Sequence, residues 1–516
     1  MLLLCLFLHF SSLRSGFFAL LCCVLCAVLY FRADMHLITV DIIKGTWNAL
    51  PIVAVIWSAV LLYSISKESG AMDCIGGMLK KITSDELLQV LMISSVAASF
   101  LQGITGYGVP IAVCAPLLIA IGVKPFWAVV LPPLGHAWGN TFGTLAMAWD
   151  ALATEGGVST PEQIRQTVLL SAILIWFWNF FALVIICWLY GGKEGVKHGF
   201  SAVLAISLSQ GGGELLFTMI NTTLACFIPS CLSVAAVILL SRTHCYCEAW
   251  SFPDSIVMQL QKIECTADDR RRISPADALL PYAFLAVLAI CVLLIPPLKK
   301  CFSLMRFSIR IPETVTGYDY SNAANYSYSP IYPFTHAAFF LLCACAMSWP
   351  VYLRKGLLHR SSTRKILFQT WKKAFTVSCS VVLLLILSKT MSDSGMAYVL
   401  ARGFSNALGK GYLLLSPFVG LTGSILTGSN MASNILFSKI QSLCAELTGL
   451  PPALILAAQT AGAAIGCAVS PNNLMLGASM VCISGQKGQL LKKLLPVTLS
   501  GAFLVGLLCA VLCFAA

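Results

Sequence analysis

Long apolar runs separated by short polar loops dominate this chain of 516 residues. A helix needs about 20 mostly apolar residues to cross the hydrocarbon core of a bilayer. Runs that reach or approach this length recur along the chain, at about 17–31, 49–66, 125–148, 166–190, 198–213, 217–240, 276–297, 332–352, 373–391, 452–482 and 494–516. The pattern predicts a polytopic α-helical membrane protein, because a spanning helix satisfies its own backbone in lipid.

The composition supports lipid as the main solvent. Charged residues make up 10% of the chain and apolar residues 58%, whereas a soluble domain carries about 25% charged residues. The net charge of +12 does not indicate a nucleic-acid partner, because the basic residues stand in short blocks between apolar runs, such as Arg364-Lys365 and Lys372-Lys373. Cytoplasmic loops of membrane proteins show this distribution.

Cysteine usage indicates neither a disulfide framework nor a metal site. The chain has 22 cysteines, and several lie inside apolar runs, as Cys22 and Cys23 do. Cysteine behaves there as a small hydrophobe, and disulfide frameworks belong to small secreted domains. Cys245 and Cys247 stand beside His244 in a polar loop, too few ligands for a zinc site. We therefore expect no metal and no cofactor.

Two further apolar regions, 88–122 and 411–442, are interrupted by glycine-rich polar turns. The first turn is Gly103-Ile-Thr-Gly-Tyr-Gly-Val-Pro110 and the second is Thr427-Gly-Ser-Asn430. Each region is typical of two half-helices joined by a turn, which must be buried in protein or line a wet cavity. We expect about 11–12 transmembrane helices plus these two broken-helix, re-entrant hairpins.

The basic loops predict the orientation of the two hairpins. Loops 241–275 and 353–373 are the richest in Lys and Arg, so we place both in the cytoplasm. Counting spans from these loops, hairpin 88–122 enters from the cytoplasm and hairpin 411–442 enters from outside. The two hairpins would then have opposite topology.

The two broken regions also resemble each other in sequence. Phe100-Leu-Gln-Gly103 and Ile425-Leu-Thr-Gly428 each precede a turn, and the following spans open on Gly122-Val-Lys-Pro125 and Gly449-Leu-Pro-Pro452. Paired interrupted segments of opposite topology indicate a secondary transporter. The alternative is that Gly and Pro are simply common in membrane helices, which explains one break more easily than two matched breaks.

The sequence therefore predicts one transmembrane domain, 1–516, built as an inverted repeat. The first repeat covers about 49–240 and the second about 276–516. Half-helix N-termini at the breaks present the positive ends of their dipoles, which suit an anionic substrate group. The sequence contains no GxxxxGK[ST], HExxH or GxSxG pattern, so we expect a transporter rather than an enzyme.

The candidate substrate-binding residues are polar or glycine residues in the two turns and in the spans that follow them. Glycines would let the backbone approach the substrate or, alternatively, let helices pack closely. Amides buried at membrane depth need a partner, either a neighbour or the substrate. The candidates are Gln102, Gly103, Thr105, Gly106, Tyr107, Gly108, His136, Asn140, Thr427, Gly428, Ser429, Asn430, Asn434, Gln459, Ser470 and Asn472.

These segments resemble the signatures of the lactate permease family. The first is Phe100-Leu-Gln-Gly-Ile-Thr-Gly-Tyr-Gly-Val-Pro-Ile-Ala112, and the second is Leu426-Thr-Gly-Ser-Asn-Met-Ala-Ser-Asn434 followed by Ala458-Gln-Thr-Ala-Gly462 and Ser470-Pro471. The resemblance runs from about residue 14 to the end and implies about one further helix at the N-terminus. It implies import of L-lactate across the plasma membrane, with D-lactate and glycolate as related substrates, driven by proton symport.

Three departures from the family pattern bear on that coupling. Gln102, Asn430 and Cys467 stand where well-known members carry Glu, Asp and Lys. Intramembrane carboxylates are the usual proton relays, and amides do not titrate. His136 is a titratable substitute or a histidine packed between helices. The open alternatives are sodium coupling, uncoupled exchange, and a channel for another small organic anion.

Overall fold

The computed structural model describes residues 12–80, 82–106, 108–259 and 273–515, and it is helical almost throughout. Within these ranges ten helices are long and apolar enough to cross a membrane, and two shorter apolar helices accompany them. This confirms the prediction of an all-α polytopic membrane protein. Outside the described residues lie 1–11, the candidate Tyr107 and the middle of the expected loop 241–275.

Helices of the first half follow the predicted runs. They are α2 (Ser12–Tyr30), α3 (Met35–Glu68), α4 (Ala71–Lys80), α5 (Glu86–Leu91), α6 (Ala98–Ile104), α7 (Val109–Ala120), α8 (Pro125–Gly135), α9 (Gly143–Gly156), α10 (Pro161–Ser207), α11 (Gly213–Ile220) and α12 (Phe227–Leu240). The π-helical turns Met92–Ala97 and Leu208–Gly212 join α5 to α6 and α10 to α11.

The second half contains ten further helices and a small β-ribbon. The helices are α13 (Pro275–Leu294), α14 (Pro296–Phe302), α15 (Ala337–Arg354), α16 (Ser362–Asp393), α17 (Met396–Leu408), α18 (Tyr412–Thr427), α19 (Asn430–Thr448), α20 (Pro452–Gly466), α21 (Pro471–Met480) and α22 (Lys487–Ala515). The strands are β1 (Phe307–Ile311), β2 (Thr314–Val315), β3 (Ser321–Asn322) and β4 (Asn325–Ile331).

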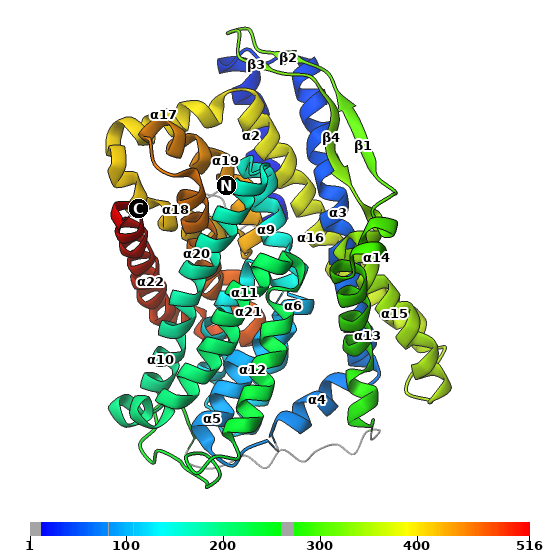
Figure 1. Ribbon diagram of the computed structural model, residues 1–516, viewed down its shortest axis with the longest axis vertical. Coiled ribbons are helices and arrows are strands. Elements are labelled where there is room, and N and C mark those ends of the chain that lie inside the picture. The colour runs from blue at the N-terminus through cyan, green and yellow to red at the C-terminus, as the bar shows by residue number, and fades with distance from the viewer. Residues whose placement is uncertain (1–11, 81, 107, 260–272, 516) are drawn as a thin grey trace.

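The helices form two groups that lie side by side (Figure 1). In the flanking layer, α16 packs along α3 and α2, and α15 packs against α3 and α13. In the central bundle, α20 packs against α18, α10 and α19, and α19 packs against α9. Contacts of α16 with α19 join the two groups, so the substrate-site candidates lie in the bundle beside a separate layer.

Both predicted hairpins are present as helix pairs broken at the glycine turns. The helix from Glu86 to Ile104 stops before α7, and α18 stops at Thr427 before α19 begins at Asn430. Figure 1 shows α5 at the end of the molecule opposite to α17, which precedes α18. The hairpins therefore start from opposite ends. The inverted repeat and the side of the membrane that each end faces stay predictions.

The spans that follow the hairpins also break midway. A 3₁₀ turn, Ala137–Asn140, separates α8 from α9, and another, Cys467–Val469, separates α20 from α21. Pro125 and Pro452 each open the first half of such a span, because proline fits the first helical turn, where its missing N–H is not needed. These midspan breaks place polar residues inside the central bundle.

Three loop and helix boundaries differ from the sequence expectation. The run 217–240 is cut at Asn221, whose extended backbone and side-chain bond to the Thr223 N–H end α11. Most of the expected loop 353–373 is the first part of α16, since Lys and Arg continue a helix readily. The long α10 bends sharply at Gly191-Gly192. The predicted run 166–190 falls on its first arm, and the run 198–213 covers its second arm and the π-helical turn that follows.

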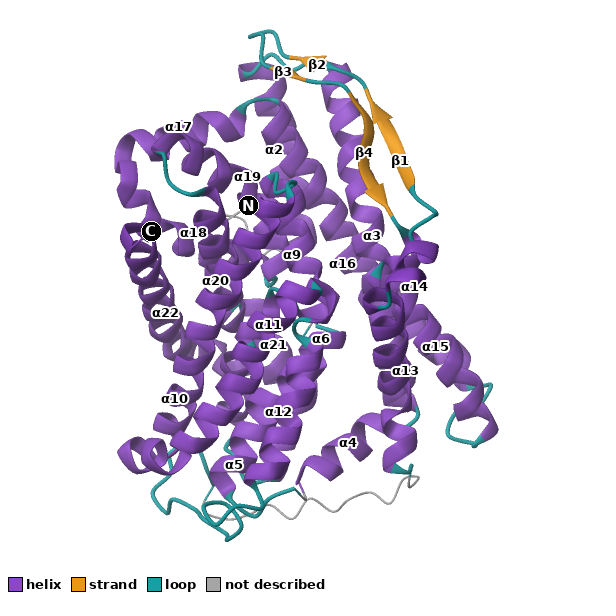
Figure 2. Ribbon diagram, viewed as in Figure 1, coloured by secondary structure: helices purple, strands orange, loops and turns teal. Residues whose placement is uncertain are grey.

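A β-ribbon, which the sequence did not predict, occupies the region 307–331. β1 and β4 pair antiparallel, with Ile309 opposite Tyr328, and the ribbon is the main strand structure in the chain (Figure 2). Trp47 of α3 donates its indole N–H to the Ser329 carbonyl at 2.9 Å. This hydrogen bond attaches β4 of the ribbon to α3 of the flanking layer.

Candidate functional site

The two broken hairpins meet at one small cavity, which we call the central cavity. Its volume is about 80 Å³, room for several water-sized groups. The residues lining it come from both hairpins and from both midspan breaks: Gln102, Gly108, Ile111, His136, Asn140, Gly143, Thr144, Met147, Ala148, Gly428, Ser429, Asn430, Met431, Cys467 and Asn473. Segments more than 300 residues apart in the chain thus share one site.

The first turn approaches α9 closely because Gly106 has no side chain. Gly106 has a φ of +54°, and a Cβ there would lie 2.3 Å from the Thr144 hydroxyl oxygen. Gly108, with a φ of +78°, caps α7 and lines the cavity. L-residues rarely adopt such backbone angles, so glycine allows both the turn and the contact.

The second turn is built in the same way. Gly428 has a φ of +80°, and a Cβ there would lie 3.1 Å from the Ser470 hydroxyl oxygen. Ser429 then caps α19 by accepting a hydrogen bond from the Ala432 N–H. Thr427 bonds back to the Gly423 carbonyl at 2.8 Å. The turn is thus held at the start of α19, beside the cavity.

A chain of amides and hydroxyls ties the cavity wall together. The Asn430 amide donates to the Thr141 hydroxyl at 3.0 Å, and the Thr141 and Thr460 hydroxyls lie 2.9 Å apart. The Asn434 amide donates to Thr460 at 3.0 Å and to the Ala148 carbonyl at 2.9 Å. α9, α19 and α20 are therefore joined through side chains that carry no charge.

His136 and Asn140 also line the cavity, at the break between α8 and α9. Nδ1 of His136 bonds the Pro132 carbonyl. A carbonyl only accepts, so Nδ1 carries the proton in this bond, and Nε2 is the nitrogen able to take up another. The Asn140 amide donates to the Ala464 carbonyl at 3.1 Å, which links the break to α20.

The electrostatics of the central cavity come from backbone rather than charged side chains. α7, α19 and α21 begin at the cavity, where Gly108, Asn430 and Asn473 line it. Each helix N-terminus is equivalent to about half a positive charge. The described lining residues include no Asp, Glu, Lys or Arg. The site is suited to a small anion without a cationic side chain.

Several candidate residues lie behind the cavity rather than in its wall. Gly103 faces α12, since a Cβ there would meet the Phe227 backbone at 3.0 Å. Thr105 bonds its hydroxyl to the Leu101 carbonyl. Gln459 bonds Gln441 at 2.8 Å, away from the lining. Ser470 and Asn472 border Gly428.

Eight lining residues were not among the candidates: Ile111, Gly143, Thr144, Met147, Ala148, Met431, Cys467 and Asn473. Thr144, Met147 and Ala148 belong to α9, and Ile111, Met431 and Cys467 complete the wall. Asn473 donates to the Gly428 carbonyl at 3.3 Å. The pair of midspan breaks could have indicated these residues from the sequence, because any residue near such a break lies close to a hairpin turn.

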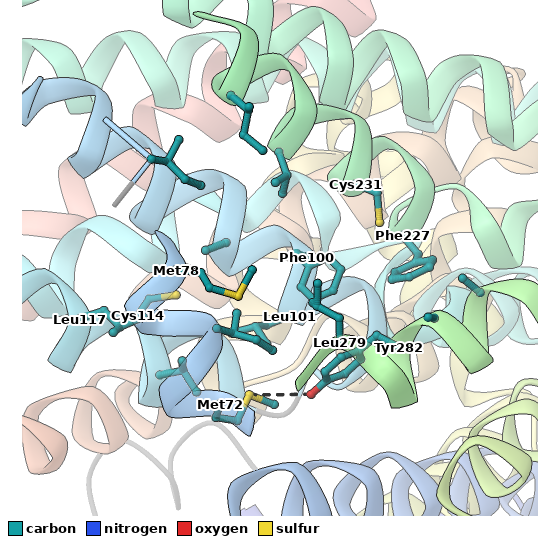
Figure 3. Close-up of a pocket in the computed structure, with 18 residues that line it drawn as sticks. Met72, Met78, Phe100, Leu101, Cys114, Leu117, Phe227, Cys231, Leu279 and Tyr282 are labelled. Atoms are coloured by element: carbon teal, nitrogen blue, oxygen red, sulfur yellow. Dashed lines mark hydrogen bonds between the residues drawn. The ribbon is translucent and has the colours of Figure 1, made fainter. Parts of the chain in front are cut away.

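A larger cavity of about 400 Å³ lies between α4, α6, α7, α12 and α13, and we call it the apolar cavity (Figure 3). Its lining is almost wholly hydrocarbon and sulfur, with Phe100, Leu101 and Phe227 projecting into it. The hydroxyl of Tyr282 bonds the Met72 sulfur at 3.8 Å. A carboxylate placed there would lose its hydration without gaining donors, so the apolar cavity is unsuited to an organic anion.

Comparisons with known proteins give one consistent result. A family model described as L-lactate permease matches residues 1–515. The chain is 26% identical over 471 residues to the L-lactate permease of Halalkalibacterium halodurans, covering 90% of this chain and 84% of the relative. It is 25% identical over 486 residues to the L-lactate permease of Escherichia coli, with 90% and 85% covered.

Two further similarities concern a glycolate permease and a solved structure. The chain is 24% identical over 530 residues to the glycolate permease GlcA of Escherichia coli, covering 96% of this chain and 90% of the relative. The crystal structure of the Alcanivorax borkumensis YdaH transporter aligns with a TM-score of 0.47 at 14% identity, over 91% of this chain and 86% of that one.

Proposed function

Because the chain belongs to the L-lactate permease family, we propose that it is a secondary transporter for small monocarboxylates. L-lactate is its main substrate, and D-lactate and glycolate are further substrates. The relatives named above include L-lactate permeases and a glycolate permease. The protein is a multi-pass protein of the plasma membrane, and family membership implies a transporter rather than an enzyme.

The observation that carries this proposal is the uncharged central cavity at the N-termini of three helices. The substrate carboxylate lies against the start of α19 and α7, where backbone N–H groups and the dipoles favour an anion. Asn430 and Ser429 stand at the start of α19. Because the site has no cationic side chain, its affinity for the anion stays low enough for the anion to be released.

The remaining wall suits the rest of a 2-hydroxy acid. Asn140 and Gln102 present amides that pair with the substrate hydroxyl, and Ile111, Met147 and Met431 present an apolar surface for its methyl group. One methyl group contributes about 1 kcal/mol of discrimination. The central cavity therefore accommodates glycolate, which lacks the methyl group, with only modestly weaker binding.

We propose that transport is coupled to a cation, a proton or sodium. The competing function is an uncoupled facilitator, exchanger or channel for another small organic anion. The uncharged central cavity favours that alternative, since no carboxylate in its described lining is available to carry a proton. Accumulation against a gradient separates the two functions, because an uncoupled protein only equilibrates its substrate.

The test uses purified protein in liposomes and labelled L-lactate, with counterflow at equal pH and uptake under an imposed pH or sodium gradient. We expect saturable counterflow that unlabelled glycolate inhibits. Asn430→Ala removes the amide at the start of α19, and one lost hydrogen bond to a charged group reduces affinity about 10- to 100-fold. The rise in KM should reflect this loss.

Tyr282→Phe, in the apolar cavity, is the matched control and should leave KM unchanged. Linear, unsaturable flux would identify a channel. Absence of flux above protein-free liposomes, with protein that unfolds cooperatively on heating, would reject the lactate assignment. An equal KM for Asn430→Ala and wild type would move the binding site away from the central cavity.

A further inference from the structure

Charged side chains, which the central cavity lacks, form a buried group at the far end of α9. We call this group the charge cluster. It consists of Asp41 and Lys44 on α3, Glu155 on α9, and Lys389 and Asp393 on α16. Lys44 and Asp393 are 2.6 Å apart, and Lys389 and Glu155 are 3.0 Å apart. The cluster joins the flanking layer to the central bundle.

The cluster contains one carboxylate more than its cations can balance. Three carboxylates, Asp41, Glu155 and Asp393, face two ammonium groups. Asp393 pairs with Lys44 and Glu155 pairs with Lys389, which leaves Asp41 without an ion pair. Asp41 is fully buried, and neither of its oxygens has a hydrogen-bond donor among the described residues. An ionised carboxylate in that setting is costly.

Asp41 lies about one turn before Lys44 on α3, and Lys44 bonds Asp393 of α16 at 2.6 Å, so both carboxyl groups lie beside the same buried ammonium group at the α3–α16 interface. Two carboxylates bond each other only when a proton lies between them, because ionised carboxylates have acceptors and no donors. The other titratable groups near Asp41 are Cys23 on α2, Lys44 on its own helix, and Lys389 on α16. The geometry therefore offers a place for one additional positive charge.

The charge cluster adjoins the substrate site through α9. Met147 of α9 lines the central cavity and also a second cavity of about 80 Å³, which we call the outer cavity. Glu155, two turns further along α9, lines the outer cavity with Asn48 and Asp150. α9 thus carries one wall of the central cavity at its start and one ion pair of the cluster at its end.

We infer that a proton, or one monovalent cation in its place, binds between Asp41 and Asp393, and that the charge cluster is the coupling site of the transporter. The inference rests on the proposed function. With the cation bound, the cluster is neutral as a whole and α9 can move with its buried pairs intact. Without the cation, an unbalanced carboxylate favours the arrangement in which water reaches the cluster.

The test separates coupling from transport in liposomes. For one proton carried per substrate, a gradient of one pH unit supports about tenfold accumulation of L-lactate. Asn mimics a neutral carboxyl group, so Asp41→Asn and Asp393→Asn should keep counterflow at equal pH and lose accumulation, which falls to about onefold. A sodium gradient at equal pH that drives wild type and not Asp41→Asn supports the same site with sodium as its occupant.

Glu214→Gln is the matched control. Glu214 is another fully buried carboxyl whose oxygens have no partner among the described residues, and it lies on α11 outside the charge cluster and both small cavities. The inference predicts wild-type accumulation for this variant. Retained accumulation in Asp41→Asn, or its loss in Glu214→Gln alone, would overturn the assignment.

An infrared measurement tests the site without relying on transport. The band of a protonated carboxyl should be present in wild type at neutral pH and reduced in both Asp41→Asn and Asp393→Asn; the same bands in all three proteins would overturn a proton site. Loss of counterflow in variants that remain folded, or wild-type counterflow that no cation gradient drives, would equally overturn the inference. Absence of counterflow in wild type would reject the proposed function instead, and the infrared band would still decide the proton site.

Discussion

The central cavity and the charge cluster are both buried inside the helical bundle, and they are built from opposite kinds of side chain. The central cavity is lined by amides, hydroxyls, glycines and helix N-termini, with no charged residue in its described lining. The charge cluster holds five charged side chains within two ion pairs and one unpaired carboxylate. α9 connects the two regions.

Recognition of an anion and compensation of buried charge therefore need not share a site. Partial charges at helix ends attract an anion without a partner that must be separated from it later. Full charges buried in pairs are costly to break, so they are suited to holding two layers in register.

Removing one charge from the cluster should cost the most stability. Lys389→Met leaves Glu155 buried without its cation, although the Ser388 hydroxyl still donates to it at 2.9 Å. Breaking a buried pair in this way costs about 3–5 kcal/mol. The thermal unfolding midpoint in detergent should fall accordingly, and adding Glu155→Gln should restore most of it. Lys410→Met, at an exposed lysine, should leave the midpoint unchanged, and an equal fall there would contradict this expectation.

Placing a charge in the central cavity should abolish its preference for anions at neutral pH. Asn430→Asp puts a carboxylate at the proposed substrate carboxylate, and Cys467 stands in the same lining where the family pattern has a Lys that would balance it. Two like charges about 4 Å apart repel by about 4 kcal/mol. L-lactate uptake at pH 7 should fall about 100-fold or more. Uptake should recover as the pH falls and the new carboxyl becomes neutral. Wild-type uptake by this variant at pH 7 would place the anion elsewhere.

Distorting the second turn should weaken binding more than it weakens folding. Gly428→Ala and Gly449→Ala each place a side chain at a helix end with positive φ. Each substitution should lower the free energy of unfolding by about 1–2 kcal/mol. Only the Cβ at residue 428 would meet a neighbour, the Ser470 hydroxyl at 3.1 Å. Similar unfolding midpoints for the two variants, with a raised KM in Gly428→Ala alone, would assign the second turn to substrate binding. Equal KM values would contradict it.

His336, which lines the outer cavity between the central cavity and the charge cluster, should make the free energy of unfolding depend on pH. His336 precedes α15 at the ribbon end, and burial lowers its pKa from the ordinary value to about 4. The unfolded chain takes up this proton near pH 6.5 and the folded protein only near pH 4. Stability is therefore full above pH 6.5 and falls by about 1–3 kcal/mol as the pH drops towards 4.

Thermal midpoints between pH 7 and pH 4.5 check this expectation. His336→Asn keeps a side chain able to cap α15 and cannot titrate, so its midpoint should depend less on pH than that of wild type. His36→Asn, at an exposed histidine of α3, should follow the wild-type curve. A midpoint for His336→Asn that tracks wild type throughout would contradict the assignment.

Filling the apolar cavity should have the smallest effect. Ala286→Leu adds hydrocarbon to a lining that is already apolar, and a few buried methylene groups contribute about 1–2 kcal/mol. The unfolding midpoint should stay equal or rise, and KM for L-lactate should not change. Ile111→Ala, which enlarges the central cavity, should raise KM. A change of several-fold in the KM of Ala286→Leu would mean that the two cavities are coupled.

Much of the fold follows from local patterns in the sequence. The apolar runs predicted the spanning helices because lipid requires them to satisfy their own backbone, and the turns at Gly106 and Gly428 predicted breaks that the structure contains. The ribbon was not predicted, because strands this short depend on pairing partners rather than on propensity. The arms of α10 were predicted as two runs because the apolar pattern stops at Gly191-Gly192.

By itself, the sequence determined the membrane class, the two broken hairpins, the midspan breaks and the family resemblance, since each depends on residues close together in the chain. The tertiary structure decided which polar residues share a cavity, turning Gly103 away and bringing in Thr144. It also decided that Asp41, Glu155 and Lys389 form one cluster. Buried charges find partners across helices, and the packing of those helices depends on the whole chain.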